Sequence, residues 1–399
     1  MKLRIFIVSP TESVITKRGK RHPNLAEYLL DKGFEVHYFT STINHASKEL
    51  FTTTELKKGK EQVDYPINFI DVGLYKKNIS PKRFIWNIKF AHKVYKALDK
   101  VVKRDDIVLF PSRPPELPYV GKLLKKKHKI KLILDIEDIW PDAFLINNKI
   151  IKSAFYMYCN ALNFKSVACF DSVFHVSPSF MKWYNRYAPT KTSVFTPLGI
   201  TSLEDNLNGK KVYSKEPNQY KLFYGGTLTL QFDIMPVLQA MLKSKLNFSI
   251  TLAGDNGSGE RAKIIQEYLD QNKIEYHNLG LLDKNSFMKH LGYSDISILP
   301  MISGGLPKKF YDALGSYKPI LCLGKGGAYD EVKNHDLGWA TSFMVDDILN
   351  ILNCLNIDVL NNKINTIAKH RSMYLEQHSL ATIHNEIIKL KQCNNSHKN

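Results

Sequence analysis

The chain has little cysteine and no long apolar run. Its five cysteines are widely spaced and form no Cys-x-x-Cys pair, which argues against a disulfide framework or a zinc site and favours a reduced cytoplasm. No apolar run reaches the roughly eighteen residues of a membrane-spanning helix. Residues 1–8 hold too short an apolar core for a signal peptide, and we expect them to form a first buried strand.

Three motifs that would assign a chemistry are also missing. The sequence contains no G-x-G-x-x-G fingerprint, no G-x-x-x-x-G-K-[ST] loop and no H-E-x-x-H helix. Their absence removes support for a dinucleotide-dependent oxidoreductase, a P-loop ATPase and a zinc peptidase. We therefore expect neither a cofactor nor a protein-bound metal.

What the sequence does contain is a long alternation of strand-like and helix-like segments over 399 residues, enough for two domains. Alternation of this kind predicts α/β domains with parallel, doubly wound sheets. The largely apolar helix expected at 148–164 is predicted to be buried, with a shallow membrane contact as the alternative. The expected boundaries are 1–200 for the first domain, 201–219 for a linker, 220–362 for the second domain, 363–391 for a helical segment that could cross back, and 392–399 for a disordered tail.

Positive charge is concentrated in the first half of the chain. Residues 1–200 hold 34 Lys plus Arg against 18 Asp plus Glu, a net charge of +16, whereas residues 201–399 hold 22 against 20, a net charge of +2. This asymmetry favours an anionic partner for the first half, such as nucleic acid, a membrane surface or a phosphorylated acceptor. Nucleic acid is disfavoured because the basic run 122–131 lacks interleaved aromatic residues.

The segment 307–320 carries the most informative pattern. It lies between two apolar runs and follows Gly304 and Gly305, an order that indicates strand, glycine loop, short helix and strand. Bare backbone N–H groups at a helix start, with the charge of Lys309, suit a phosphate, and Asp312 one turn later could hold a pair of sugar hydroxyls. The alternative is a surface helix with a solvated Lys and Asp.

Glycine turns recur at successive expected strand ends of the second domain. Gly225, Gly226 and Thr227 follow the first strand, and Gly254 closes the next strand. The turn at Gly280 and Leu281 could present backbone groups to a nucleobase. Each of these turns alone also fits a plain tight turn, but together they indicate one phosphate-accepting rim.

The segment 134–142 is the most acidic in the first domain. Asp135, Glu137 and Asp138 follow a buried strand and precede Trp140 and Pro141. Carboxylates at a strand end are candidates for acid–base work or for binding an acceptor hydroxyl. Helix capping by Asp138 is the alternative, and Trp140 suits either sugar stacking or packing.

In combination these segments resemble the family-four retaining glycosyltransferases of the GT-B type, most closely the bacterial branch that builds O-antigens, capsules and exopolysaccharides. The likeness covers most of the chain. The matching segments, in order, are Lys17-Arg18-Gly19, the helix–Gly–strand run 25–41, the His-x-x-Lys at 45–48, the D-I-x-D-x-W-P at 135–141, Gly225-Gly226-Thr227 and the Pro-x-Lys loop 307–312.

The resemblance implies a GT-B fold, two doubly wound Rossmann-like domains facing across a cleft, and a role for individual residues. The sequence departs from the family pattern at three places: Asp312 stands in place of Glu, Gly304 stands in place of an earlier acidic residue, and no charged residue follows the glycine turn. Because of the third departure, Lys309, with Lys308 or Arg18, would bind the phosphates. The implied donor site comprises Gly225, Gly226, Thr227, Gly280, Leu281, Gly304, Gly305, Lys309 and Asp312. The implied acceptor site comprises Arg18, Gly19, Glu137 and Asp138, with Asp138 and Lys309 as the catalytic pair.

We therefore expect a cytoplasmic, membrane-peripheral glycosyltransferase. It would move a hexosyl or N-acetylhexosaminyl unit from a nucleotide-sugar, UDP-linked by expectation, to a lipid-diphosphate-linked saccharide, with retention of configuration implied by the resemblance. The alternatives are a nucleotide-sugar epimerase on the same fold, a nucleic-acid-binding protein and a non-catalytic carbohydrate-binding module. The first needs no membrane acceptor and leaves the basic half unexplained.

Overall fold

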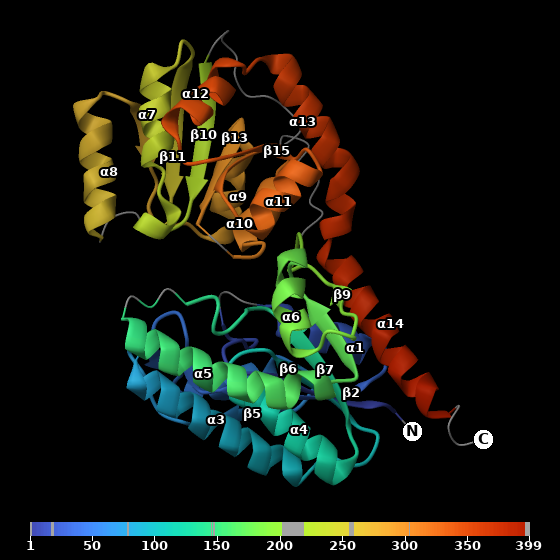
Figure 1. Ribbon diagram of the computed structural model, residues 1–399. Coiled ribbons are helices and arrows are strands. Elements are labelled where there is room, and N and C mark those ends of the chain that lie inside the picture. The colour runs from blue at the N-terminus through green and yellow to red at the C-terminus, as the bar shows by residue number, and fades with distance from the viewer. Residues whose placement is uncertain are drawn as a thin grey trace. The chain divides into compact units, whose positions relative to one another are not determined.

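The chain forms two compact units (Figure 1). The computed structural model describes residues 2–16, 20–77, 80–144, 146, 148–201, 219–254, 259–302 and 304–395, with residues 393–395 described by their backbone alone. Unit 1 comprises Met1–Thr196 and Leu380–Asn399, and unit 2 comprises Pro197–Ser379. The expected linker at 201–219 lies almost wholly outside the described residues.

Unit 1 is built on a seven-stranded sheet in which every neighbouring pair is parallel, in the order β5-β2-β1-β6-β7-β8-β9. The central strands are buried apolar runs, as a sheet covered on both faces requires. Its strands are β1 (Arg4–Ser9), β2 (Glu35–Ser41), β5 (Ile67–Ile70), β6 (Ile107–Pro111), β7 (Lys131–Ile136), β8 (Ser172–His175) and β9 (Val194–Phe195), and a separate antiparallel hairpin pairs β3 (Ile43–Asn44) with β4 (Glu49–Leu50).

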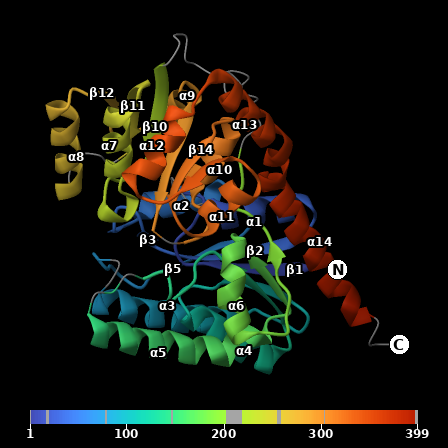
Figure 2. The same ribbon diagram turned by 45° about the horizontal axis from the view of Figure 1, so that its top comes forward.

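Helices cover both faces of this sheet. Helix α3 (Pro81–Asp99), α4 (Glu116–His128) and α5 (Lys149–Ser166) lie side by side on one face (Figure 2). On the other face, Leu25 of α1 (Arg21–Asp31) and Ile383 of α14 (Glu376–Asn395) share one core with β1 and β2. The remaining helices of unit 1 are α2 (Thr53–Glu61), which begins at a capping box of Thr52 and Glu55, and α6 (Met181–Tyr187).

Unit 2 repeats the same plan with a six-stranded parallel sheet in the order β12-β11-β10-β13-β14-β15. Its strands are β10 (Gln219–Gly225), β11 (Asn247–Ala253), β12 (Glu275–Asn278), β13 (Ile296–Met301), β14 (Ile320–Gly324) and β15 (Gly338–Thr341). Its helices are α7 (Met235–Lys243), α8 (Glu260–Gln271), α9 (Lys284–Gly292), α10 (Lys308–Gly315), α11 (Gly327–Asn334), α12 (Val345–Asn353), α13 (Ile357–His370) and the start of α14.

Both sheets reverse their strand order at the first strand. The chain first extends the sheet from β1 to β2 and β5, and then continues on the other side of β1 with β6; unit 2 does the same at β10 and β13. In doubly wound sheets, ligands bind outside the carboxyl ends of the strands at this switch point. The loops that follow β1, β6, β10 and β13 are therefore the places to search for a site.

The predicted fold class is confirmed, because both units are parallel-sheet α/β units. Three local predictions need correction. The continuous helix expected at 363–391 is two helices, because the backbone at Tyr374 and Glu376 pairs with Ile200 instead of continuing the helical ladder: Ile200 N donates to Tyr374 O at 2.7 Å and Glu376 N donates to Ile200 O at 3.2 Å. Helix α14 also continues past residue 391 to Asn395.

The second and third corrections concern burial. Helix α5 was predicted to be buried, yet it exposes Ile150, Met157 and Phe164, whose exposed fractions are 81%, 71% and 59%. Helix α1 begins at Arg21, four residues before the helix–Gly–strand run 25–41 named above, so Arg21 belongs to a buried first turn of this helix.

Candidate functional site

Three glycine turns of unit 2 interlock at the carboxyl ends of adjacent strands. Gly226 N donates to Ala253 O at 2.8 Å, and Gly254 N donates to Gly280 O at 2.7 Å. A Cβ atom on Gly254, whose φ is +141°, would lie 2.3 Å from the carbonyl oxygen of Gly226, so only glycine fits there. The predicted rim of glycine turns is thus one continuous piece of backbone.

Lys309 reaches this rim from the first turn of α10. Its Nζ lies 4.4 Å from the ring centre of Phe232 and 5.1 Å from that of Tyr224, and 3.5 Å from the position that a Cβ on Gly226 would take. Burial lowers the pKa of Lys309 to about 8, against a smaller opposing effect of the Cys322 thiol. Among the described residues, no carboxylate lies within ion-pair distance of this ammonium group, which leaves it available to an anion.

Asp312 lies elsewhere on the same helix. Its Oδ1 accepts a hydrogen bond from Lys284 Nζ of α9 at 2.6 Å. Lys309 and Asp312 are one turn apart, but they contact different neighbours, so a nucleotide that uses Asp312 has to share it with Lys284.

The other predicted donor residues differ in how they are presented. Thr227 is exposed and its carbonyl accepts from the Tyr224 hydroxyl at 2.7 Å, while Leu281 beside Gly280 is 70% exposed. Gly304, at φ +116°, is exposed and its carbonyl accepts from Gly327 N at 2.8 Å, which ties the Gly304–Gly305 loop to the start of α11.

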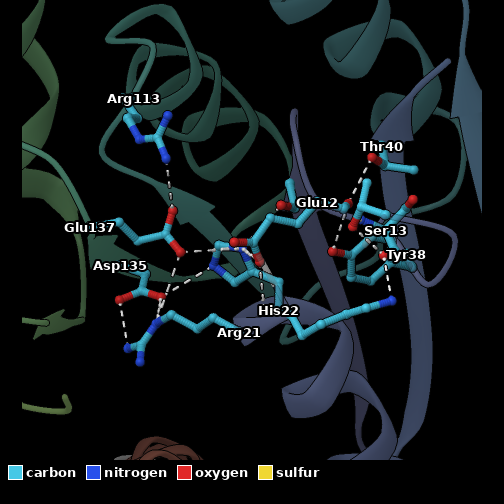
Figure 3. A network of polar contacts seen from close by, with 12 residues as sticks. Glu12, Ser13, Arg21, His22, Tyr38, Thr40, Arg113, Asp135 and Glu137 are labelled. Atoms are coloured by element: carbon cyan, nitrogen blue, oxygen red, sulfur yellow. Dashed lines mark hydrogen bonds and ion pairs between the residues drawn. The ribbon is translucent and has the colours of Figure 1, made fainter. Parts of the chain in front are cut away.

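Unit 1 holds a buried charge network at the corresponding edge of its sheet (Figure 3). Asp135, at the end of β7 and fully buried, accepts from Arg21 Nε at 2.7 Å and from Arg21 Nη2 at 3.0 Å. His22 Nε2 lies 3.1 Å from the same carboxylate and its Nδ1 lies 3.0 Å from Ser9 Oγ. Burial opposes ionisation of Asp135, but the Arg21 and His22 charges outweigh it and hold the pKa of Asp135 well below its usual range.

Two further carboxylates face His22 from the other side. Glu12 Oε2 and Glu137 Oε1 each lie 3.7 Å from His22 Nδ1. Burial disfavours a charged His22, but the carboxylates of Glu137, Asp135 and Glu12 overcome this effect and raise its pKa to about 9. Burial and the neighbouring charges of Glu12 and Asp135 raise the pKa of Glu137 to about 7, despite the opposing charges of His22 and Arg113.

Arg113 connects the network to the predicted acceptor residues. It follows β6, and its side chain lies 3.8 Å from Glu137 and 3.7 Å from Asp138. Asp138 is one-third exposed and accepts from Trp140 Nε1 at 3.2 Å. Trp140 itself is buried against Phe144, so it packs in the core of unit 1 and does not offer its ring face for sugar stacking.

The same cluster contains the one group of possible metal ligands among the described residues. Glu12, His22 and Glu137 offer one ligand atom each within 4.8 Å of one another. Their spacing in the sequence does not reveal this, because the three residues come from separate segments. A protonated His22 supplies positive charge at the same place, so the carboxylates are compensated without a metal ion.

Comparison with known proteins identifies the fold. No model of a protein family matches the chain. Protein CapJ of Staphylococcus aureus is 21% identical over 309 residues, which cover 74% of this chain and 72% of CapJ. The structure of sucrose-phosphate synthase from Thermosynechococcus elongatus matches with a TM-score of 0.70 at 12% identity, covering 98% of this chain and 100% of that one. The chain has the GT-B fold.

Two further GT-B structures extend this comparison. HepE of Anabaena, solved in complex with UDP and glucose, matches with a TM-score of 0.66 at 13% identity over 98% of this chain and 100% of its own. WaaG, a glycosyltransferase involved in lipopolysaccharide biosynthesis, matches with a TM-score of 0.64 at 11% identity over 96% of this chain and 99% of its own.

The residues predicted for the GT-B sites fall into three groups. The structure brings Gly225, Gly226, Gly280 and Lys309 to one edge of unit 2, and Glu137 and Asp138 to one edge of unit 1. Arg18 and Gly19 lie outside the described residues. Sequence reasoning missed Glu12, His22 and Arg113, because these residues lie near Glu137 only through the fold.

Proposed function

We propose that this GT-B protein is a retaining glycosyltransferase of the family-four type. It moves a hexosyl or N-acetylhexosaminyl unit from a UDP-sugar to a saccharide acceptor during the synthesis of a bacterial surface polysaccharide. The observation that carries the proposal is Lys309, a partly buried ammonium group with no carboxylate partner among the described residues, set against the Gly226 turn at the switch point of unit 2. The UDP complex of HepE and the similarity to CapJ support it.

Unit 2 would act on the leaving group. As the glycosidic bond to the diphosphate breaks, negative charge grows on the departing oxygen, and a fixed cation lowers the energy of that state. Lys309 is protonated at neutral pH because its pKa of about 8 lies above it, and it is held in place by the rings of Tyr224 and Phe232. The Gly226 turn carries no side chain, so a diphosphate can approach the backbone closely beside Lys309.

Unit 1 would bind the acceptor. Asp138 presents a partly exposed carboxylate that can accept hydrogen bonds from hydroxyl groups, and the Arg113 side chain lies 3.7 Å from it. Glu137, with a pKa raised to about 7, exists in both protonation states near neutral pH and can donate or accept a hydrogen bond. A hydroxyl group of a sugar is a suitable partner for both carboxyl groups.

The acceptor would be lipid-linked and reached at an anionic membrane surface. Among the described residues no helix is long and apolar enough to cross a bilayer. Helix α5 instead exposes a stripe of apolar side chains at intervals of three and four residues, flanked by the exposed Lys149, Lys152 and Lys165. Such a helix binds in the plane of an anionic interface. The stripe consists of Ile150, Ala154, Met157, Ala161 and Phe164.

The decisive experiment is sugar transfer by Lys309→Ala. Loss of a charge-assisted hydrogen bond of about 1.5–3 kcal/mol lowers kcat/KM by roughly 10- to 150-fold. Lys333→Ala, an exposed lysine on α11 of the same unit, serves as the control and should change little. Transfer by Lys309→Ala at the wild-type rate would remove Lys309 from the site, and conversion of the UDP-sugar to an isomer without any acceptor would replace the transferase by an epimerase.

Liposome sedimentation tests the membrane part separately. Met157→Glu places a charge in the apolar stripe and should release the protein from vesicles containing anionic lipid. Met344→Glu is the matched control, since Met344 in unit 2 is also mainly exposed, at 65%. Equal binding of both variants at low salt would show that α5 does not face the membrane.

A further inference from the structure

A second group of cations in unit 1 lies apart from the carboxylate network. It is formed by the turn between β3 and β4, which carries His45 and Lys48, and by Arg83 in the first turn of α3. Arg83 Nη1 lies 3.3 Å and Lys48 Nζ 3.4 Å from His45 Nδ1. Two cationic groups therefore converge on one imidazole nitrogen.

The imidazole is neutral and its free nitrogen is a donor. Burial, together with the charges of Arg83, Lys48 and Arg113, lowers the pKa of His45 to about 3. Since Nδ1 also accepts from the Tyr75 hydroxyl, the ring proton resides on Nε2. This N–H has no partner among the described residues, so it is available to an acceptor.

Arg83 is buried, and the described residues include no counter-ion for it. It is 6% exposed, its guanidinium carbon lies 4.2 Å from the ring centre of Tyr75, and its Nε donates to Asn87 at 3.2 Å. Within the described part of the chain, no carboxylate lies within ion-pair distance of Arg83 or Lys48. Burying a cation without a partner is costly, and natural proteins accept this cost chiefly where an anion binds.

The surroundings add a hydrophobic element. Leu74, Ile85 and Ile88 are exposed by 48%, 50% and 42%; Leu74 directly precedes Tyr75, and Ile85 lies two residues after Arg83. Phe84 packs edge-on against Tyr158 of α5 at 4.8 Å, which joins this turn of α3 to the helix that carries the apolar stripe. A ligand that fits here carries negative charge at one end and an apolar chain at the other.

We propose that His45, Lys48 and Arg83, with Arg113 at their edge, bind the phosphoryl groups of a chain-bearing diphosphate such as the lipid carrier of the acceptor. The site deepens the proposed function and rests on it for the identity of the acceptor. Because Arg113 also lies beside Asp138, a diphosphate held here would be next to the predicted acceptor carboxylate.

The test is equilibrium binding to the full chain, by calorimetry, of three probes: inorganic pyrophosphate, geranyl diphosphate and UDP. The variants are Arg83→Met, which keeps an apolar stem over Tyr75, and Lys48→Gln in the exposed turn. Lys82→Met, the exposed neighbour of Arg83 on the same helix turn, is the control. Thermal unfolding of each variant establishes that it is folded. Because Arg83 has no ion-pair partner among the described residues, Arg83→Met should melt within about 3 °C of the wild type.

We expect geranyl diphosphate to bind the wild type more tightly than pyrophosphate does. Both site variants should lower the affinity for geranyl diphosphate by about tenfold or more, whereas Lys82→Met should change it by less than about twofold. The affinity of the site variants for UDP should also change by less than about twofold. Unchanged geranyl diphosphate affinity in both site variants would overturn the site. If the site variants lose as much affinity for UDP as for geranyl diphosphate, the cations belong to the donor site. If the wild type binds pyrophosphate as tightly as geranyl diphosphate, the site does not recognise the apolar chain of the ligand. A wild-type protein that binds geranyl diphosphate but transfers no sugar would refute the proposed function and leave this site standing.

Discussion

Units 1 and 2 share one strand order but differ in what they place at its switch point. In unit 1 the charges satisfy one another: Asp135 binds Arg21 and His22, and Glu137 lies between His22 and Arg113. In unit 2 the switch point has bare glycine backbone and Lys309, whose neighbours are aromatic rings.

This difference separates two ways of preparing a protein for a ligand. A network of mutually paired charges is rigid and orients neutral polar groups, such as sugar hydroxyls, without needing a charge from the ligand. The Lys309 ammonium group over the glycine turn has no carboxylate partner in the part of the chain that the structure describes, so it is ready to bind an anion. The comparison therefore predicts that disturbing unit 1 damages the fold first, while disturbing unit 2 damages binding first.

The largest effect is expected from Asp135→Ala. Removing one partner of a buried ion pair leaves the other charge without compensation, so the free energy of unfolding should fall by about 3–5 kcal/mol. Chemical denaturation measures this value. Asp142→Ala is the control, because the Asp142–Arg186 pair is bidentate but partly exposed, and its loss should cost about 1 kcal/mol or less. Similar losses in both variants would contradict the special role of the buried network.

The pH dependence of stability tests the network more finely. The pKa of His22 is about 9 in the folded chain and about 6.5 when unfolded, so its protonation stabilises the fold fully below pH 6.5 and ceases to do so as pH rises through 9. The loss between these values is on the order of 3 kcal/mol. Denaturation at pH 6 and pH 9.5 should show this decline in the wild type and a smaller one in His22→Gln. A decline of equal size in the variant would assign it to other groups.

In unit 2 the corresponding signature is proton uptake on binding. At pH 8.5 Lys309 is mostly neutral because its pKa is about 8, and a bound diphosphate favours the charged form. Binding of UDP should take up a fraction of a proton, which calorimetry in buffers of different ionisation enthalpy detects. Lys309→Met should show no uptake, and uptake that persists in this variant would place the titrating group elsewhere.

The smallest effect is expected at Asp312. Asp312→Asn weakens an ionised acceptor for ribose hydroxyls, so UDP affinity should fall by about threefold to tenfold. Lys284→Ala removes the competing partner of the same carboxylate and should leave UDP affinity unchanged or raise it. If both variants bind UDP as the wild type does, Asp312 is a structural partner of Lys284 alone.

The sequence predicted what depends on local pattern. The order of strands and helices followed from apolar periodicity, and the turns at Gly226, Gly254 and Gly280 followed from the position of glycine after strand-like runs. The acidic segment 134–142 was singled out because its carboxylates come directly after a strand-like apolar run. These features depend on residues that are neighbours in the chain.

What the sequence did not reveal depends on contacts between distant segments. Glu12 and His22 reach Glu137 only because the first and fifth parallel strands of one sheet end at the same edge. The break before α14 arises from pairing with Ile200, and no local signal marks it. The exposure of α5 was also missed, since an apolar helix has the same composition whether it faces a core or a membrane.

The division of α14 between the units limits how the protein can be dissected. Ile383 and Ile387 fill the core of unit 1, although they lie far beyond residue 196 in the chain. A fragment that ends at Thr196 would leave Leu25 and Ile5 uncovered, and its aggregation would imitate membrane binding in a sedimentation assay. A fragment of unit 1 fit for such an assay needs residues 380–395 joined to Thr196 through a designed connection, so that the core is closed before any surface is tested.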